Sequence, residues 1–135
     1  MDEPPRLFTL ESAQQLLDTV VRPLAERLVS LRARSRDLEH RWRQVVLAVA
    51  SNGGNMRTPD VDELRARVER SHAELRELLD QIAGHGVQVK DVERGLLDFP
   101  TERAGRIVLL CWMVGEERIA HWHTLEDGFG GREPL

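Results

Sequence analysis

Two histidines stand two residues apart near the C-terminal end of the chain, at His121 and His123. The segment that contains them, Ile119–Thr124, is rich in Ile and Trp and is typical of a β-strand. On a strand, residues i and i+2 point to the same face, so both imidazoles project together. Neutral imidazole is a ligand for Zn, Fe, Cu or Ni. The pair therefore predicts part of a divalent transition-metal site, with Zn or Fe as the expected ion.

Two histidines do not complete a metal site, so at least one further ligand must come from a neighbouring segment. The residues that could supply it are Asp91, Glu93, Asp98, Glu117 and Cys111. Asp91 and Asp98 lead this set, either as direct ligands or as acceptors that fix the imidazole tautomers. The competing interpretation is structural: each imidazole donates a hydrogen bond to a carboxylate or carbonyl and leaves no room for an ion.

The face of the sheet on which Cys111 lies depends on the length of the following turn. A turn of two or four residues puts Trp112 on the histidine face and Cys111 on the other, whereas three residues would put Cys111 with the histidines. Gly115 at the start of the turn favours an even length. We therefore expect Cys111 to be a buried small hydrophobic residue rather than a ligand or nucleophile. The sequence shows no arrangement of Ser, His and Asp that would support a hydrolase.

Lys90 and Arg132 are the basic residues with the most informative contexts. Lys90 is the single lysine of a chain whose other basic residues are all Arg, and it precedes Asp91, with Glu93 close behind. An ion pair with one of these acids is the expected role, and a catalytic Lys is the alternative. Arg132 ends the glycine-rich run 128–132, which resembles a phosphate-binding loop in composition only. Because no helix follows it, we expect a tail or a clamp.

Composition limits the class of protein. A chain of 135 residues with 41% hydrophobic and 31% charged residues predicts one soluble domain. The net charge of -4 argues against nucleic acid as a partner. The sequence contains no apolar run long enough to span a membrane and no secretory signal. A single Cys forms no internal disulfide, so we expect a cytoplasmic protein.

Residues 9–84 have the periodicity of two helices, after a loose tail over residues 1–8. Thr9 is a suitable N-cap for the first helix, and Thr58 followed by Pro59 for the second. Pro23 lies inside the first pattern and predicts a kink near Val20–Arg22. The stripe of the first helix steps by four and three through Leu17, Val21, Leu24, Leu28, Leu31, Ser35, Leu38, Trp42, Val45 and Val49, with Ser35 as its one polar member. The second stripe comprises Val61, Leu64, Val68, Leu75, Leu78 and Ile82.

The helices and the segment after them predict an α+β fold. A short Gly-containing loop between helices of similar length favours a long kinked antiparallel helical hairpin. Residues 85–135 change to strand-like patterns at Val87–Val89, at Leu96–Phe99 ending before Pro100, and at Ile107–Val114. We expect a small three- or four-stranded antiparallel β-meander that packs on the hairpin.

Both faces of Ile107–Val114 are apolar, and one helical hairpin covers only one face of a small sheet. The other face needs the segment before Pro23 or a second subunit, and the heptad stripes offer another surface for association. The sequence therefore predicts a homodimer.

The chain resembles an uncharacterised bacterial family, domain-of-unknown-function family 2203. The resemblance covers nearly the whole chain and is most specific in the last fifty residues. It depends on Phe8-Thr9-Leu10, Asn52-Gly53-Gly54, Val89-Lys90-Asp91, Gly95-Leu96, Asp98-Phe99-Pro100, Gly105-Arg106, Cys111-Trp112, Gly115-Glu116, Trp122-His123, Gly128-Phe129 and Gly131-Arg132. It implies a helical hairpin with a sheet and assigns no activity to any residue. His123 matches its pattern, whereas His121 departs from it.

Two functions from different classes follow. The first is a small self-associating interaction or structural protein. The second is a metal- or small-ligand-binding domain, with or without turnover, whose site lies where His121 and His123 meet the acids of residues 90–98.

Overall fold

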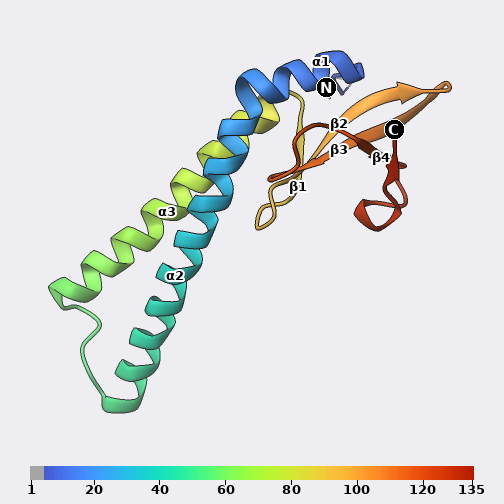
Figure 1. Ribbon diagram of the computed structural model, residues 1–135. Coiled ribbons are helices and arrows are strands. Elements are labelled where there is room, and N and C mark those ends of the chain that lie inside the picture. The colour runs from blue at the N-terminus through green and yellow to red at the C-terminus, as the bar shows by residue number, and fades with distance from the viewer. Residues whose placement is uncertain (1–4) are drawn as a thin grey trace.

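The computed structural model describes residues 5–135, which form a long helical hairpin with a small antiparallel sheet at one end (Figure 1). The helical elements are α1 (Leu10–Leu16), a π-helical turn η1 (Leu17–Val21), α2 (Arg22–Asn52) and α3 (Pro59–Gly84). The remaining elements are β1 (Gln88–Asp91), β2 (Leu96–Arg103), β3 (Arg106–Met113), β4 (His121–His123), a 3₁₀ turn η2 (Phe129–Gly131) and β5 (Glu133–Pro134). The predicted α+β architecture is confirmed. No helix in this part of the chain is long and apolar enough to cross a membrane.

The predicted break near Pro23 is present as a π-helical turn. Thr9 caps α1, and at the end of η1 the N–H of Arg22 donates to the carbonyl of Leu17, five residues back. Pro23 follows directly and has no N–H to offer, so the regular hydrogen-bond ladder cannot run through this point. The chain bends there, and α1 lies over the sheet while α2 runs away from it (Figure 1). The break begins slightly before the expected Val20–Arg22.

The tail expected over residues 1–8 is anchored at its end; residues 1–4 lie outside the described part. Phe8 is buried and forms a parallel bridge with Thr101. Its N–H donates to the carbonyl of Pro100 (2.7 Å), and its own carbonyl accepts the Thr101 hydroxyl (2.6 Å). The Arg6 guanidinium lies over its ring. This contact attaches the chain to β2 directly before α1 begins.

The two heptad stripes pack against each other within the chain. Leu28, Leu31 and Leu38 of α2 are buried, and their counterparts on α3 are Leu64, Leu75, Leu78 and Ile82. Ser35, the polar position of the first stripe, is also buried, and its hydroxyl accepts that of Ser71 on α3 (3.3 Å). The contact between α2 and α3 thus buries much of the heptad stripes, the surface from which association was predicted.

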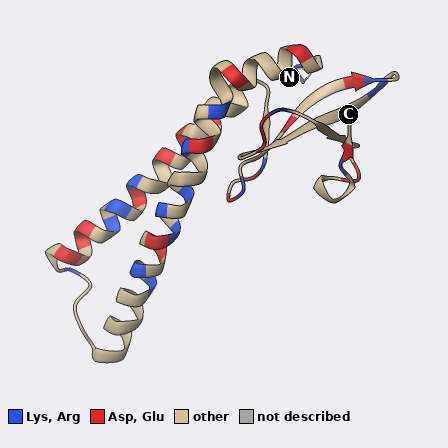
Figure 2. Ribbon diagram, viewed as in Figure 1, with Lys and Arg blue, Asp and Glu red and all other residues tan. Residues whose placement is uncertain are grey.

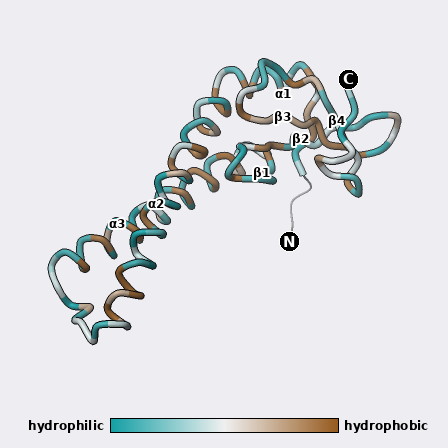
Figure 3. The backbone as a smooth tube through the Cα atoms, turned by 60° about the horizontal axis from the view of Figure 1, so that its bottom comes forward, coloured by the Kyte–Doolittle hydropathy of each residue, from teal (hydrophilic) through white to brown (hydrophobic). Residues whose placement is uncertain are grey.

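The packing loosens where the hairpin extends beyond the sheet. Trp42, Val45 and Val49 are only half-buried there. Val46 is 39% exposed and Leu47 is 66% exposed. Figure 3 shows hydrophobic residues continuing along α2 into this end. We call residues 42–63 the tip of the hairpin.

The sheet is a meander of five antiparallel strands in the order β1-β2-β3-β4-β5, not three or four. The additional strand, β5, comes from the segment expected to be a tail. Pro100 does not end β2, which continues to Arg103. The backbone N and O of Pro100 point to the edge of β2 that β1 does not reach. At this edge only the carbonyl of Pro100 is used, as the acceptor for the N–H of Phe8, so the missing N–H of Pro100 breaks no hydrogen bond of the sheet.

The two faces of the sheet are covered by different parts of the chain. Leu97, Phe99, Leu110 and Trp112 pack in one cluster with α1, η1, α2 and α3. On the opposite face Leu109 and Cys111 are also buried, although the helices lie on the other side. The C-terminal segment, residues 124–132, reaches this outer face. The chain itself therefore covers much of the face that motivated the predicted homodimer, while Ile107 on the same face is 43% exposed.

Gly95 packs closely against Val29 of α2, and it gives a test of this packing. Its φ is +66°, and a Cβ there would overlap Val114 and lie 2.8 Å from the Val29 side chain. We expect Gly95→Ala to lower the free energy of unfolding by about 2–4 kcal/mol, through left-handed strain and overpacking. Gly105→Ala is the matched control, because its φ is +77° but no atom lies within 4 Å of the added Cβ. The control should cost about 1–2 kcal/mol in urea unfolding; equal losses would contradict the packing argument.

Candidate metal centre

The antiparallel register of β2, β3 and β4 brings four candidate residues to one face of the sheet. Asp98 is paired with Cys111, which is paired with His121, and His123 lies two residues further along β4. Directly paired residues share a face, as do residues i and i+2 of one strand. The expected face of Cys111 was wrong, because Cys111 lies with the histidines and Trp112 faces the helices, whereas its expected burial is confirmed. The connection from Met113 to His121 contains an odd number of residues, so Gly115 does not lead a tight even turn.

Asp98, Cys111 and His123 form a compact buried cluster, which we call the triad. The three residues are 0%, 0% and 3% exposed, respectively. One carboxylate oxygen, the sulfur and one ring nitrogen all lie within 4.8 Å of one another. Ligand atoms around tetrahedral Zn(II) are about 3.3–3.8 Å apart, from bond lengths of about 2.0–2.3 Å. A contraction of about 1 Å would therefore bring the triad to coordination distance.

His123 is held by hydrogen bonds at both ring nitrogens. Nδ1 lies 2.8 Å from the backbone carbonyl of Thr124, and Nε2 lies 3.0 Å from each carboxylate oxygen of Asp98. A carbonyl oxygen only accepts, so Nδ1 carries a hydrogen. Nε2 and Asp98 consequently share one further proton, either as an imidazolium–carboxylate pair or as a neutral imidazole and a carboxylic acid. The ring orientation is fixed in both cases.

Cys111 is a protonated thiol in this environment. Burial, followed by the negative charge of Asp98, raises the pKa of the Cys111 thiol from 9.0 to about 12. A thiolate nucleophile needs a lowered pKa and access to solvent, and Cys111 has neither. Deprotonation here requires a cation that takes the place of the proton.

His121 lies beside the triad but takes part in a different network. Nη2 of Arg132 lies 2.9 Å from Nδ1 of His121 and 3.0 and 2.9 Å from the two carboxylate oxygens of Glu116. Because Arg only donates, Nδ1 of His121 is the acceptor, and its 3.8 Å contact with Glu116 is not an ion pair. Glu116 also accepts the backbone N–H of Met113 (2.7 Å). Arg132 is thus a clamp between the C-terminal segment and the β3–β4 connection.

The remaining candidates lie away from the triad. Asp91 closes the β1–β2 turn: its Oδ1 accepts the N–H groups of Glu93 and Arg94, and its Oδ2 binds the Arg94 side chain (2.9 Å). These hydrogen bonds, led by the Arg94 side chain, lower the pKa of Asp91. Asp91 is therefore a turn residue and not a partner of the histidines.

Lys90, Glu93 and Trp112 have other roles as well. Lys90 is exposed on β1, and no ion pair joins it to any acid within residues 5–135. Glu93 pairs instead with Arg32 and Arg36 of α2 (3.9 and 3.2 Å). Trp112 donates its indole N–H to the carbonyl of Glu116 (3.0 Å) on the helix-facing side.

Two groups at the site were not singled out from the sequence. Glu116, the acceptor for Arg132, occurs in the Gly115-Glu116 motif, so the resemblance pointed to it while Glu117 was considered instead. Glu117 is exposed and offers its backbone carbonyl to Arg22 (2.9 Å). The Thr124 carbonyl is a backbone group that any residue would supply, so residue types carry no signal for it.

The raised pKa of Cys111 makes the metal-free protein sensitive to alkali. The unfolded chain loses the thiol proton from about pH 9, whereas the folded chain keeps it to about pH 12. The free energy of unfolding should therefore fall by about 1.4 kcal/mol per pH unit within this window. The chain has no Tyr and its single Lys is exposed, so few other groups compete. Urea unfolding across the window should show a smaller slope for Cys111→Ala; equal slopes would contradict this origin.

Comparisons with known proteins assign the chain to a family of uncharacterised proteins. The model of an uncharacterised conserved protein family, DUF2203, matches residues 6–135. No curated protein and no solved structure matches the chain. The match covers the hairpin, the sheet and every residue of the triad, and the predicted resemblance is confirmed. The chain belongs to the DUF2203 family of uncharacterised conserved proteins.

Proposed function

We propose that this protein is a metal-binding domain in which Asp98, Cys111 and His123 hold a divalent transition metal, Zn(II) or Fe(II). One observation carries the proposal: three buried side chains of different ligand types bring their donor atoms within 4.8 Å of one another. A thiolate, an imidazole and a carboxylate are the donors that Zn(II) uses in proteins.

The surroundings of His123 suit this role. Metal-bound histidines usually donate their second ring N–H to a carbonyl or carboxylate, which fixes the tautomer. Here Nδ1 donates to Thr124, so Nε2 is the nitrogen directed at Asp98. In the metal-free protein a proton bridges Nε2 and the carboxylate, and a cation would replace that proton.

The fourth position of a tetrahedral site is left to His121 or to water. His121 shares the face of the triad and neighbours Cys111, but its Nδ1 is held by Arg132. A site with three protein ligands keeps an exchangeable position, as catalytic Zn(II) sites do, whereas four protein ligands make a structural site. The ligand count thus separates a binding centre from an enzymatic one.

Binding of Co(II), a spectroscopic substitute for Zn(II), tests the proposal on untagged, chelator-treated protein. We expect one equivalent to bind with a thiolate-to-metal charge-transfer band. Cys111→Ser should abolish the band, and His123→Gln should weaken binding by more than about 100-fold, since even residues that only orient ligands account for about 10–100-fold. Apparent affinity should rise by about tenfold or more per pH unit between neutral pH and about pH 10, because binding displaces the thiol proton as well as the proton shared by His123 and Asp98.

Asp91→Asn and Asp98→Asn form a matched pair for the same measurement. Only the second changes the triad, so Asp91→Asn should bind as the wild type does. Failure of the wild type to bind Co(II) or Zn(II) stoichiometrically would leave the structural interpretation, in which the imidazole–carboxylate pair anchors the C-terminal segment without an ion.

A second candidate function, self-association, is favoured by the exposed apolar tip. Val46 and Leu47 project from a hairpin whose helices carry opposite charge: α2 has seven Arg and three acids, and α3 has seven acids and four Arg (Figure 2). Exposed apolar side chains grouped at one end of a molecule are typical of a protein-binding surface. We propose a homodimer that acts in the cytoplasm, where a single Cys stays reduced.

The homodimer has a direct test. Light scattering should give a mass approaching twice 15.4 kDa as the concentration rises. The exposed double variant Val46→Ser, Leu47→Ser should remain at 15.4 kDa without loss of helix content. A wild-type mass near 15.4 kDa at every workable concentration would exclude self-association.

A further inference from the structure

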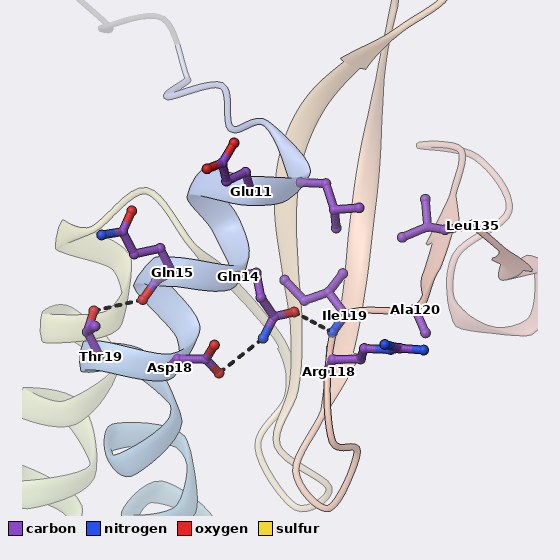
Figure 4. Close-up of a pocket in the computed structure, with 10 residues that line it drawn as sticks. Glu11, Gln14, Gln15, Asp18, Thr19, Arg118, Ile119, Ala120 and Leu135 are labelled. Atoms are coloured by element: carbon purple, nitrogen blue, oxygen red, sulfur yellow. Dashed lines mark hydrogen bonds between the residues drawn. The ribbon is translucent and has the colours of Figure 1, made fainter.

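An open groove separates α1 from the β4–β5 end of the sheet (Figure 4). Its volume is about 1080 Å³, and its apolar lining consists of Leu10, Ile119, Ala120 and Leu135. Leu10 and Leu135 are each 45% exposed. A second hollow lined by Leu7 and Phe8 shares Leu10 and Leu135 with it, so the apolar strip continues along the start of α1.

The groove exists because the helices do not reach the last strands of the sheet. The Leu135 N–H donates to the Ala120 carbonyl (2.9 Å), which extends the β4–β5 pairing by one step. Trp122 packs against the core on the helix side, and alternation along β4 places Ala120 on that same face. α1 covers this face only in part, and the remainder has no partner within residues 5–135.

The large exposed hydrophobic residues divide mainly between this groove and the tip of the hairpin. Of the seven such residues in the described chain, Leu10 and Leu135 line the groove, Leu7 lines the adjoining hollow, and Val46 and Leu47 lie on the tip. The two surfaces lie at opposite ends of the molecule (Figure 1). One chain therefore cannot bring them together, but two copies can.

The charges around the two surfaces are complementary. Glu11 lies at one end of the groove and Arg118 at the other, and neither forms an ion pair within residues 5–135 (Figure 4). The tip offers both signs, with Arg43 one turn before Leu47 and Glu63 in the first turns of α3. Each end of the groove can thus meet an opposite charge.

Contact between two tips is the less favourable alternative. Leu47 continues a stripe on α2 that contains Arg36, His40 and Arg43, at helix spacings of three and four. Antiparallel packing of this stripe against its own copy would oppose positive charges. The groove presents Glu11 instead.

From these observations we propose that two copies associate antiparallel, with the tip of each hairpin seated in the α1–β4 groove of its partner. The arrangement rests on the self-association proposed above and is independent of the metal centre. Two-fold symmetry makes both contacts identical and closes the assembly at a dimer. It also doubles the buried area, which matters because stable interfaces bury about 1,200–2,000 Å² in total.

Intermolecular paramagnetic relaxation tests the placement. The Ser51→Cys variant carries the spin label at an exposed position one turn after Leu47. It is mixed with wild-type protein that is ¹⁵N-labelled and carries no spin label. Native Cys111 is fully buried, so the label reacts at the new site only. We expect broadened amide signals in α1 and at Ile119–Ala120. A label on Leu125→Cys, also exposed but in the C-terminal segment, is the control and should leave α1 sharp.

The possible results distinguish docking of the tip in the groove from self-association by another surface. Broadening confined to residues 42–63 would mean that tips contact tips and would overturn the groove. A dimeric mass with broadening at neither surface would overturn it as well and leave self-association standing. A monomeric mass at all concentrations would reject both. Glu11→Arg should weaken the dimer about tenfold or more, and addition of Arg43→Glu should restore it if these ends meet.

Discussion

The pairing register of β2, β3 and β4 determines most of what is distinctive in this protein. Cys111 opposes both Asp98 and His121, so a polar row crosses the sheet on one face. The same register places Trp112 and Leu110 on the other face, in the core beneath the helices. A shift of one residue would exchange the two sets, exposing Trp112 and burying the polar row in the helical core. Burial of Trp112 and Leu110 therefore holds the candidate metal ligands in place.

A buried polar row needs partners, and this explains the path of the C-terminal segment. The segment after β4 supplies the Thr124 carbonyl to His123 and the Arg132 guanidinium to Glu116 and His121. Removing one member of a buried hydrogen-bonded pair costs about 1–3 kcal/mol, because its partner stays buried without a hydrogen bond. The covering segment, the imidazole–carboxylate pair and the Arg132 clamp thus stabilise one another. A cation that replaced the shared proton would act on all three.

The sequence predicts the helical part well and the sheet in outline. Long heptad stripes, the Thr caps and Pro23 are strong local signals, and the hairpin and its break follow from them. The fifth strand is two residues long and forms only because β4 is there to pair with it, so no local pattern marks it. The prediction that the strand ends before Pro100 was wrong, because the effect of a proline depends on which edge of the strand its nitrogen faces. That edge is set by the tertiary structure and not by the local sequence.

The candidate site shows the same limit more sharply. The HxH spacing correctly places two imidazoles on one face, but residue types cannot show that His123 turns to Asp98 while His121 turns to Arg132. Asp91 and Asp98 are the same residue type and close in sequence, yet Asp91 folds back on its own turn because two N–H groups lie within reach there. The side of the sheet that Cys111 occupies depended on the parity of one connection, which no single turn residue settles. A candidate ligand set thus follows from residue types, whereas the pairing that selects its members follows from register and from the backbone groups that each side chain meets first.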